Sequence, residues 1–167
     1  MYSRILVPVD GSEASFGALN EAVQLAKQQG GELRLLHIVK APMLDYGFSA
    51  DDSSRQDIIA ALSKIGKSIL ANANATVREQ GLAPECLLIE SVAGSAAAVI
   101  LAQARQWPAN LIVMGSHPRG GPRAVGSDTA EVLSGSPIPV LMVRGIAGPA
   151  EHPALDYASA FPLTAEV

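Results

Sequence analysis

The sequence has a single cysteine, Cys86, among its 167 residues. No disulfide bond can form within the chain, which excludes the small secreted proteins whose folds depend on disulfide bridges. This cysteine usage is typical of a reducing compartment. Long hydrophobic runs are also absent near the amino terminus, where residues 5–9 are too few for a signal-peptide core or a membrane span. We therefore expect a soluble cytoplasmic protein.

Aromatic and charged residues are scarce as well. Aromatic residues make up 4% of the chain, so the core must be aliphatic. Charged residues make up 17% and hydrophobic residues 49%, which excludes disorder of the whole chain. The formal net charge of −4 removes the broad positive field that non-specific nucleic-acid binding needs and disfavours anionic membranes. We expect neither nucleic acid nor a membrane as a partner.

Short apolar runs alternate with segments of helical period along the chain, and this alternation predicts βα units around a parallel sheet. The length suits one domain. The apolar stripes from Phe16 to Ala26 and from Ile58 to Val77 predict the first two helices. The remaining expected helices cover residues 96–106 and 127–134, and the expected strands cover residues 4–9, 32–39, 85–91, 111–115 and 138–144.

Two segments lack a clear period. Residues 40–55 contain Pro42, Gly47 and several Asp and Ser residues, so we expect a long connector that is either a lid or a loose loop. Residues 145–167 carry three prolines, and we expect an irregular tail. Docking of this tail on a partner is the alternative.

The end of the first strand is one candidate binding site, because ligands of open parallel sheets bind beyond the carboxyl ends of the strands. Pro8, Val9, Asp10, Gly11 and Ser12 follow one another there. This order brings a carboxylate directly after a buried strand and a hydroxyl to the start of a helix. The alternative is purely structural, with Asp10 forming a turn and Ser12 capping the helix.

The second candidate is the loop GSHPRGGPRAVGSD at residues 115–128, with four glycines in positions 115–127. Glycine lets backbone amides approach an anion closely, and the helix starting at Ser127 presents free N–H groups, so the loop suits phosphate. No Asp or Glu occurs from Ser91 to Ser127, whereas Arg119 and Arg123 do, which makes the local potential less negative. A flexible surface loop with solvated arginines is the alternative.

Other nucleotide motifs do not fit. Gly66, Lys67 and Ser68 spell the end of a P-loop, but Ala61 replaces its first glycine and the triplet lies in a helical stripe. The segment from Gly121 to Ser127 has the glycine spacing without the lysine that P-loop enzymes use. The Rossmann pattern GxGxxG does not occur.

Metal and covalent chemistry have little support. His37, His117 and His152 are too scattered to suggest a metal site, and no catalytic triad or acid–base pair is evident. We expect Cys86 to be a small core residue rather than a nucleophile. An enzymatic activity is therefore not predicted, and weak ATP hydrolysis stays an alternative.

Four segments of the chain resemble the universal stress protein family over residues 1–144. They are RILVPVDGSE at residues 4–13, LRLLHIV at 33–39, NLIVMGSH at 110–117 and GSDTAEVLSGSPIPVLMVR at 126–144. The resemblance implies an α/β fold with an open five-stranded parallel sheet in the order 3-2-1-4-5 and helices on both faces, which is the Rossmann-like type of the adenine nucleotide alpha hydrolases. Residues 1–144 would form this domain, and residues 145–167 the tail.

The resemblance further implies that an adenine nucleotide, such as ATP, binds at the carboxyl ends of the first and fourth strands. The positions of Pro8, Val9 and Asp10 would meet the nucleoside, and that of Ile38 would line the adenine pocket. Those that would follow the ribose and phosphates are Met114, Gly115, Gly126, Ser127 and Asp128. Within the loop between them, His117, Arg119 and Gly121 are further candidate binding residues.

The chain departs from the family pattern in this loop. Pro118 stands where the second glycine of the family motif belongs, so an N–H donor is lost. Only seven residues separate Pro118 from Gly126 where the family has nine, which shortens the loop by up to ~7 Å. Asp128 would compete with a phosphate for the same helix amides, although His117, Arg119 and Arg123 offset its charge. A dimeric adaptor that binds no nucleotide is therefore the alternative function.

The fifth strand, residues 138–144, would lie at an edge of this sheet, and its sequence IPVLMVR is apolar on both faces. Such an edge favours pairing with another strand. The resemblance implies a homodimer through this segment. Alternatively, the chain from Gly145 onward covers the edge.

Overall fold

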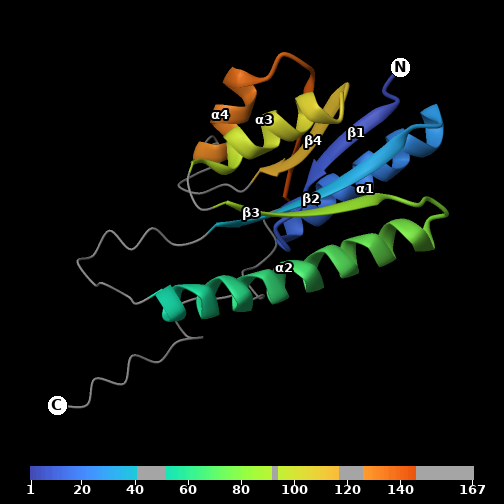
Figure 1. Ribbon diagram of the computed structural model, residues 1–167. Helices are drawn as coiled ribbons and strands as arrows, with labels where there is room; N and C mark the ends of the chain where they lie inside the picture. The colour runs from blue at the N-terminus through green and yellow to red at the C-terminus, as the bar shows by residue number, and fades with distance from the viewer. Residues whose placement is uncertain (41–51, 92–93, 117–125, 146–167) are drawn as a thin grey trace.

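The computed structural model describes residues 1–40, 52–91, 94–116 and 126–145. Strands and helices alternate along the chain (Figure 1). In chain order they are β1 (Arg4–Pro8), α1 (Glu13–Gln29), β2 (Glu32–Lys40), α2 (Asp52–Glu79), β3 (Glu85–Ser91), α3 (Ala96–Gln106), β4 (Leu111–Ser116), α4 (Ser127–Gly135) and β5 (Val140–Arg144).

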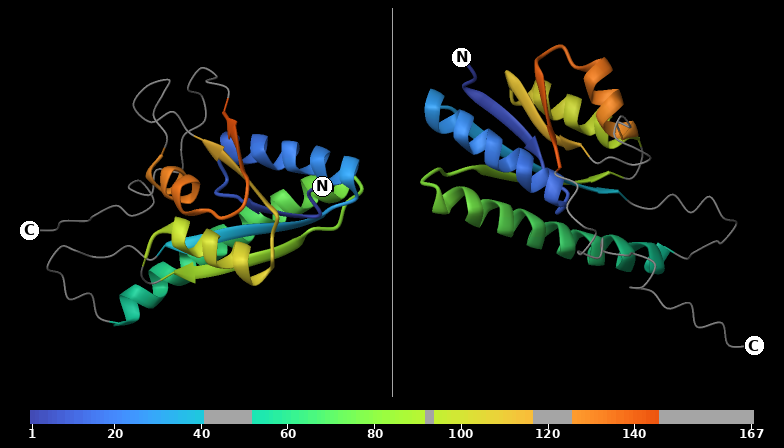
Figure 2. Two further views of the ribbon diagram at one scale, coloured as in Figure 1. Left: turned by 90° about the horizontal axis from the view of Figure 1, so that it is seen from above. Right: turned by 180° about the vertical axis from the view of Figure 1, so that it is seen from behind.

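All five strands form one parallel sheet in the order β3-β2-β1-β4-β5, which confirms the predicted topology. Helices α1 and α2 cover one face of the sheet, and α3 and α4 cover the other (Figures 1 and 2). β1 and β4 are neighbours at the centre, although α1, which follows β1, and α4, which follows β4, lie on opposite faces. The connections therefore diverge between these two strands, which is where ligands of open α/β sheets bind.

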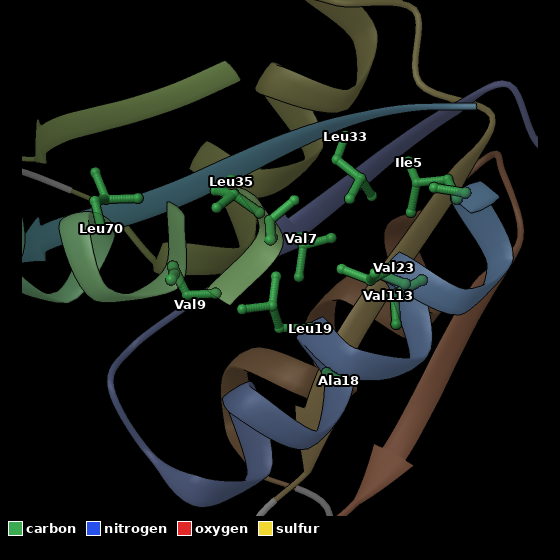
Figure 3. Packing of buried hydrophobic residues seen from close by; sticks show 14 of the residues in the cluster. Ile5, Val7, Val9, Ala18, Leu19, Val23, Leu33, Leu35, Leu70 and Val113 are labelled. Carbon is green, nitrogen blue, oxygen red and sulfur yellow. The ribbon is translucent and has the colours of Figure 1, made fainter. Parts of the chain in front are cut away.

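Aliphatic side chains fill the core on both faces, as the low aromatic content predicts. The cluster between the sheet and α1 and α2 joins Val7 and Val113 to Leu19 and Leu70 (Figure 3). A second cluster joins Leu6 and Met114 of the sheet to α3 and α4. The largest fully buried side chains are all Ile, Leu or Val.

Local sequence explains where α1 begins and ends. The Ser12 side chain accepts a hydrogen bond from the Ser15 backbone N–H at 3.1 Å, which caps the first turn. Gly30 ends the helix with φ 64°, a left-handed conformation that favours glycine. The predicted stop at this glycine is therefore confirmed.

Several predicted boundaries were inexact. α2 begins at Asp52, inside the predicted connector, because Asp and Ser favour helix starts as well as turns. The rest of that connector, residues 41–51, lies outside the described residues. β5 begins at Val140 rather than at residue 138. Pro139 precedes it, and a proline has no N–H to donate to a sheet.

The prediction that Cys86 belongs to the core was wrong. Its side chain is exposed, because β3 is an edge strand and Cys86 lies near its start. Among the described helices, none is both long enough and apolar enough to cross a membrane.

Candidate functional site

The candidate site lies where β2, β1 and β4 end side by side at the carboxyl edge of the sheet. Because side chains alternate between the two faces of a strand, the predicted residues divide into two groups. Ile38 and Met114 belong to the cluster on the α3 and α4 side. Pro8 shares that face, since Leu6, two residues earlier, lies in the same cluster. Val9 is instead buried on the α1 and α2 side (Figure 3).

Asp10 is exposed, and its carboxylate forms a local turn. Oδ1 accepts hydrogen bonds from the Ser12 N–H at 3.0 Å and the Ser12 hydroxyl at 2.5 Å. The Ser15 hydroxyl in turn donates to the Ser12 carbonyl oxygen at 2.9 Å. The structural alternative from the sequence, a turn at Asp10 and a cap at Ser12, is thus present. A nucleoside hydroxyl that used Oδ1 would have to share it with Ser12.

The backbone of Val9 is also occupied within the protein. Its N–H donates to the Leu36 carbonyl oxygen at 2.8 Å. Its carbonyl oxygen lies 2.7 Å from Nδ1 of the buried His37, so this nitrogen must carry the proton and donate. The His37 ring packs against Gly66, where an added Cβ would lie 2.5 Å from the ring Cδ2. His37 therefore holds the end of β1 in place.

Gly115 has a packing role that explains its lack of a side chain. A Cβ built there would lie 2.4 Å from the backbone carbonyl carbon and oxygen of Ala14. Since Ala14 belongs to the first turn of α1, a glycine at this position lets α1 approach β4 closely. Whether Gly115 also contacts a ligand stays a prediction.

Gly126 differs from Gly115, because the only described atom within 4 Å of a Cβ built there, its chain neighbours aside, is Thr129 Oγ1, at 3.9 Å. Gly126 precedes α4, and no side-chain hydrogen bond caps this helix. The first backbone N–H groups of a helix have no partners within the helix and suit an anion. Ser127, the first residue of α4, is exposed.

Asp128, the second residue of α4, forms an ion pair with Lys40. Lys40 Nζ lies 2.9 Å from Asp128 Oδ2, and the two side chains are 50% and 40% exposed. Lys40 is the last residue of β2, and β1 separates β2 from β4 in the sheet. The ion pair therefore links the two sides of the candidate site.

Sequence reasoning missed Lys40 and the structural role of His37. The sequence did contain one indication that Lys40 reaches the site. Lys40 follows Ile38 by two residues and Leu36 by four, so it shares their face of β2, and it is the last residue of that strand. The predicted loop residues His117, Arg119 and Gly121 lie outside the described residues.

The described residues offer few groups for catalysis. They contain no cluster of three or more His, Cys, Asp or Glu side chains that could hold a metal ion. The pKa of Cys86 is shifted, but this residue lies away from the site. Partial burial raises the pKa of this thiol, Arg78 lowers it and Glu85 raises it.

Comparisons with known proteins agree with this fold. The model of the universal stress protein family matches residues 1–144. Universal stress protein YxiE of Bacillus subtilis is 34% identical over 151 residues, which cover 86% of this chain and 100% of that protein. The structure of universal stress protein UspA from Lactobacillus plantarum is 30% identical with a TM-score of 0.70, over 86% of this chain and 98% of the other.

Two more distant structures contain a nucleotide. A universal stress protein in complex with cAMP is 23% identical, with a TM-score of 0.63 over 87% of this chain and 99% of the other. A family member from Arabidopsis thaliana with AMP bound is 16% identical, with a TM-score of 0.64 over 87% of this chain and 93% of the other. At this identity the likeness shows the shared fold. The match of the family model over residues 1–144 and the 34% identity with YxiE show that the chain belongs to the universal stress protein family.

Proposed function

We propose that this chain is a cytoplasmic stress-response protein that binds an adenine nucleotide, ATP, ADP or AMP, at the carboxyl edge of β1, β2 and β4. The complexes of two structural neighbours with cAMP and AMP support the choice of nucleotide. The residues that we assign to the site are Pro8, Val9, Asp10, Ile38, Met114, Gly115, His117, Arg119, Gly121, Gly126, Ser127 and Asp128.

One observation carries the proposal. The partly exposed side chain of Ile38, with the buried Met114, lies on the same face of the sheet as α4, whose first turn has no side-chain cap. An apolar surface beside free backbone N–H groups is complementary to a flat base linked to a phosphate. Gly126 leaves space at that helix start, with no described atom closer than 3.9 Å to a built Cβ.

Isothermal titration of the full chain with ATP, ADP and AMP tests the proposal. We expect micromolar binding that Gly126→Val weakens, because its branched side chain fills the space in front of α4. Ala75→Val on the exposed surface of α2 is the matched control and should bind as the wild type does. Circular dichroism should show that both variants are folded.

The absence of both a heat signal and thermal stabilisation at millimolar nucleotide would overturn nucleotide binding. Phosphate release above that of Gly126→Val in the same samples would show that the bound nucleotide is also hydrolysed.

A specific observation favours a second function, that of a dimeric adaptor without nucleotide. Asp10 Oδ1, the Val9 backbone and the Asp128 carboxylate all have partners within the protein. β5 is an edge strand, and Leu141 on it is 38% exposed. In either function we propose a homodimer through residues 138–144.

Mass analysis of small molecules released from freshly purified protein distinguishes the nucleotide-binding function from the adaptor function, because an adaptor releases no nucleotide.

A further inference from the structure

We propose that Asp128 is a specificity-determining residue, which lowers the affinity of the site for ATP relative to adenosine by holding the Lys40 ammonium group in an ion pair. This inference rests on the proposed function, since it concerns which adenine compound the same site prefers. It assigns to Lys40 a part in the site that the sequence analysis did not predict.

The geometry of the pair brings it to the phosphate end of the proposed site. Lys40 shares a strand face with Ile38, two residues earlier on β2. Asp128 lies in the first turn of α4, where the helix amides carry a partial positive charge. The 2.9 Å contact between Lys40 Nζ and Asp128 Oδ2 spans from one element to the other. A phosphate that approached the start of α4 would therefore meet both side chains.

The charges of the pair oppose phosphate binding in two ways. The Asp128 carboxylate repels a phosphate and offsets the positive potential of the helix start. It also neutralises Lys40, which is otherwise a cation suited to a phosphate. Adenosine carries no phosphate charge and is insensitive to both effects. Each added phosphate makes the ligand more sensitive to them.

The pair can be changed without a large cost in folding. Both side chains are about half exposed, and ion pairs at such positions contribute little to stability. Neutral substitutions of nearly equal size, Asp128→Asn and Lys40→Gln, remove one charge each. We compare the ratio of ATP affinity to adenosine affinity within each variant. A general loss of binding lowers both affinities alike and leaves this ratio unchanged.

Isothermal titration with adenosine, AMP and ATP, with EDTA present, tests the inference. We expect Asp128→Asn to raise the ATP to adenosine affinity ratio about tenfold, because Lys40 becomes free to pair with phosphate. Lys40→Gln should lower the ratio below that of the wild type, since it leaves the carboxylate unpaired. The increase in the affinity ratio of Asp128→Asn should become smaller as salt is raised from about 50 to about 500 mM, because salt screens interactions between exposed charges.

Asp57→Asn and Lys67→Gln are the matched controls, because each removes the same charge from an exposed position on α2, on the opposite face of the sheet. Their ratios should equal that of the wild type. Measurable binding with an unchanged ratio in Asp128→Asn would overturn the inference and leave the proposed function intact. Absence of binding by the wild type and all variants would overturn both.

Discussion

Two glycines that the family resemblance assigns to one loop have different physical reasons for lacking a side chain. A Cβ at Gly115 would collide with backbone atoms of Ala14 at 2.4 Å, whereas the nearest described atom to one at Gly126, its chain neighbours aside, is Thr129 Oγ1 at 3.9 Å. Backbone atoms cannot move aside as a flexible side chain does. Gly115 is therefore required by packing in the free protein, whereas the described residues impose no such requirement at Gly126.

This contrast predicts effects of different size when one methyl group is added at each glycine. Gly115→Ala should lower the free energy of unfolding by about 2–3 kcal/mol, because α1 must shift away from β4. Gly126→Ala should cost no more than about 1 kcal/mol, the difference between glycine and alanine at a helix start. Urea denaturation of the two variants measures both values. Equal losses would contradict the packing role of Gly115.

The thiol of Cys86 gives a prediction on pH dependence. Its pKa is raised, mainly by partial burial, so at a given alkaline pH less of it is thiolate than in a free cysteine. The rate of alkylation by iodoacetamide should therefore rise with a midpoint above that of a cysteine peptide. Arg78→Gln should move the midpoint further up, and Glu85→Gln should move it down. A midpoint at or below that of the peptide would contradict this environment.

At the scale of elements, the start of α1 links stability to the site. The Ser12 hydroxyl accepts the Ser15 N–H and donates to Asp10, so one side chain caps the helix and orients the carboxylate. The Ser95 hydroxyl acts similarly at α3, where it accepts the Ala98 N–H and donates to Glu131 Oε1 of α4 at 2.8 Å. The starts of α1 and α3 are thus each tied to a carboxylate, that of Asp10 and that of Glu131 on α4.

Removing the first of these caps should be measurable. Ser12→Ala should lower the free energy of unfolding by about 1 kcal/mol, the usual cost of losing a helix cap. Ser68→Ala, on the exposed surface of α2, is the control and should change stability by less than about 0.5 kcal/mol. Thermal unfolding of both variants tests the difference. A Ser12→Ala protein as stable as its control would argue against the cap.

At the scale of the whole molecule, the sheet order leaves β5 with one neighbour, β4. The exposed large hydrophobic residues among those described are Met1, Leu133 on α4 and Leu141 on β5. Only Leu141 lies on an edge strand, where unpaired backbone groups favour another strand. This edge is the part of the described surface that best suits a second copy of the chain.

Sedimentation equilibrium tests the proposed dimer. The wild type should sediment as a dimer at micromolar concentration, and Leu141→Lys should shift it toward monomer, because a charge at an edge strand opposes strand pairing. Leu133→Lys introduces the same charge at a similarly exposed leucine and should leave the dimer intact. A monomeric wild type, or equal effects of the two variants, would contradict the assignment to β5.

Much of the fold was predictable because buried strands and helix faces appear in the sequence as apolar runs and as apolar residues at helical spacing. β3 has the predicted bounds, and the predicted stop of α1 at Gly30 is confirmed. The exposure of Cys86 was missed although the resemblance implied an edge strand, because a small apolar residue at the start of a strand carries no local signal of whether it is covered. The start of α2 at Asp52 was missed since the same polar residues serve turns and helix starts.

The sequence by itself determined the succession of strands and helices, the aliphatic core and the family, because each depends on residue type and short-range spacing. Only the tertiary structure decided which site residues share a face and which polar groups already have partners. The His37 contact with Val9 joins residues 28 apart, and the Lys40 contact with Asp128 joins residues 88 apart. No local period encodes such pairs, since the path of the chain through the sheet brings them together.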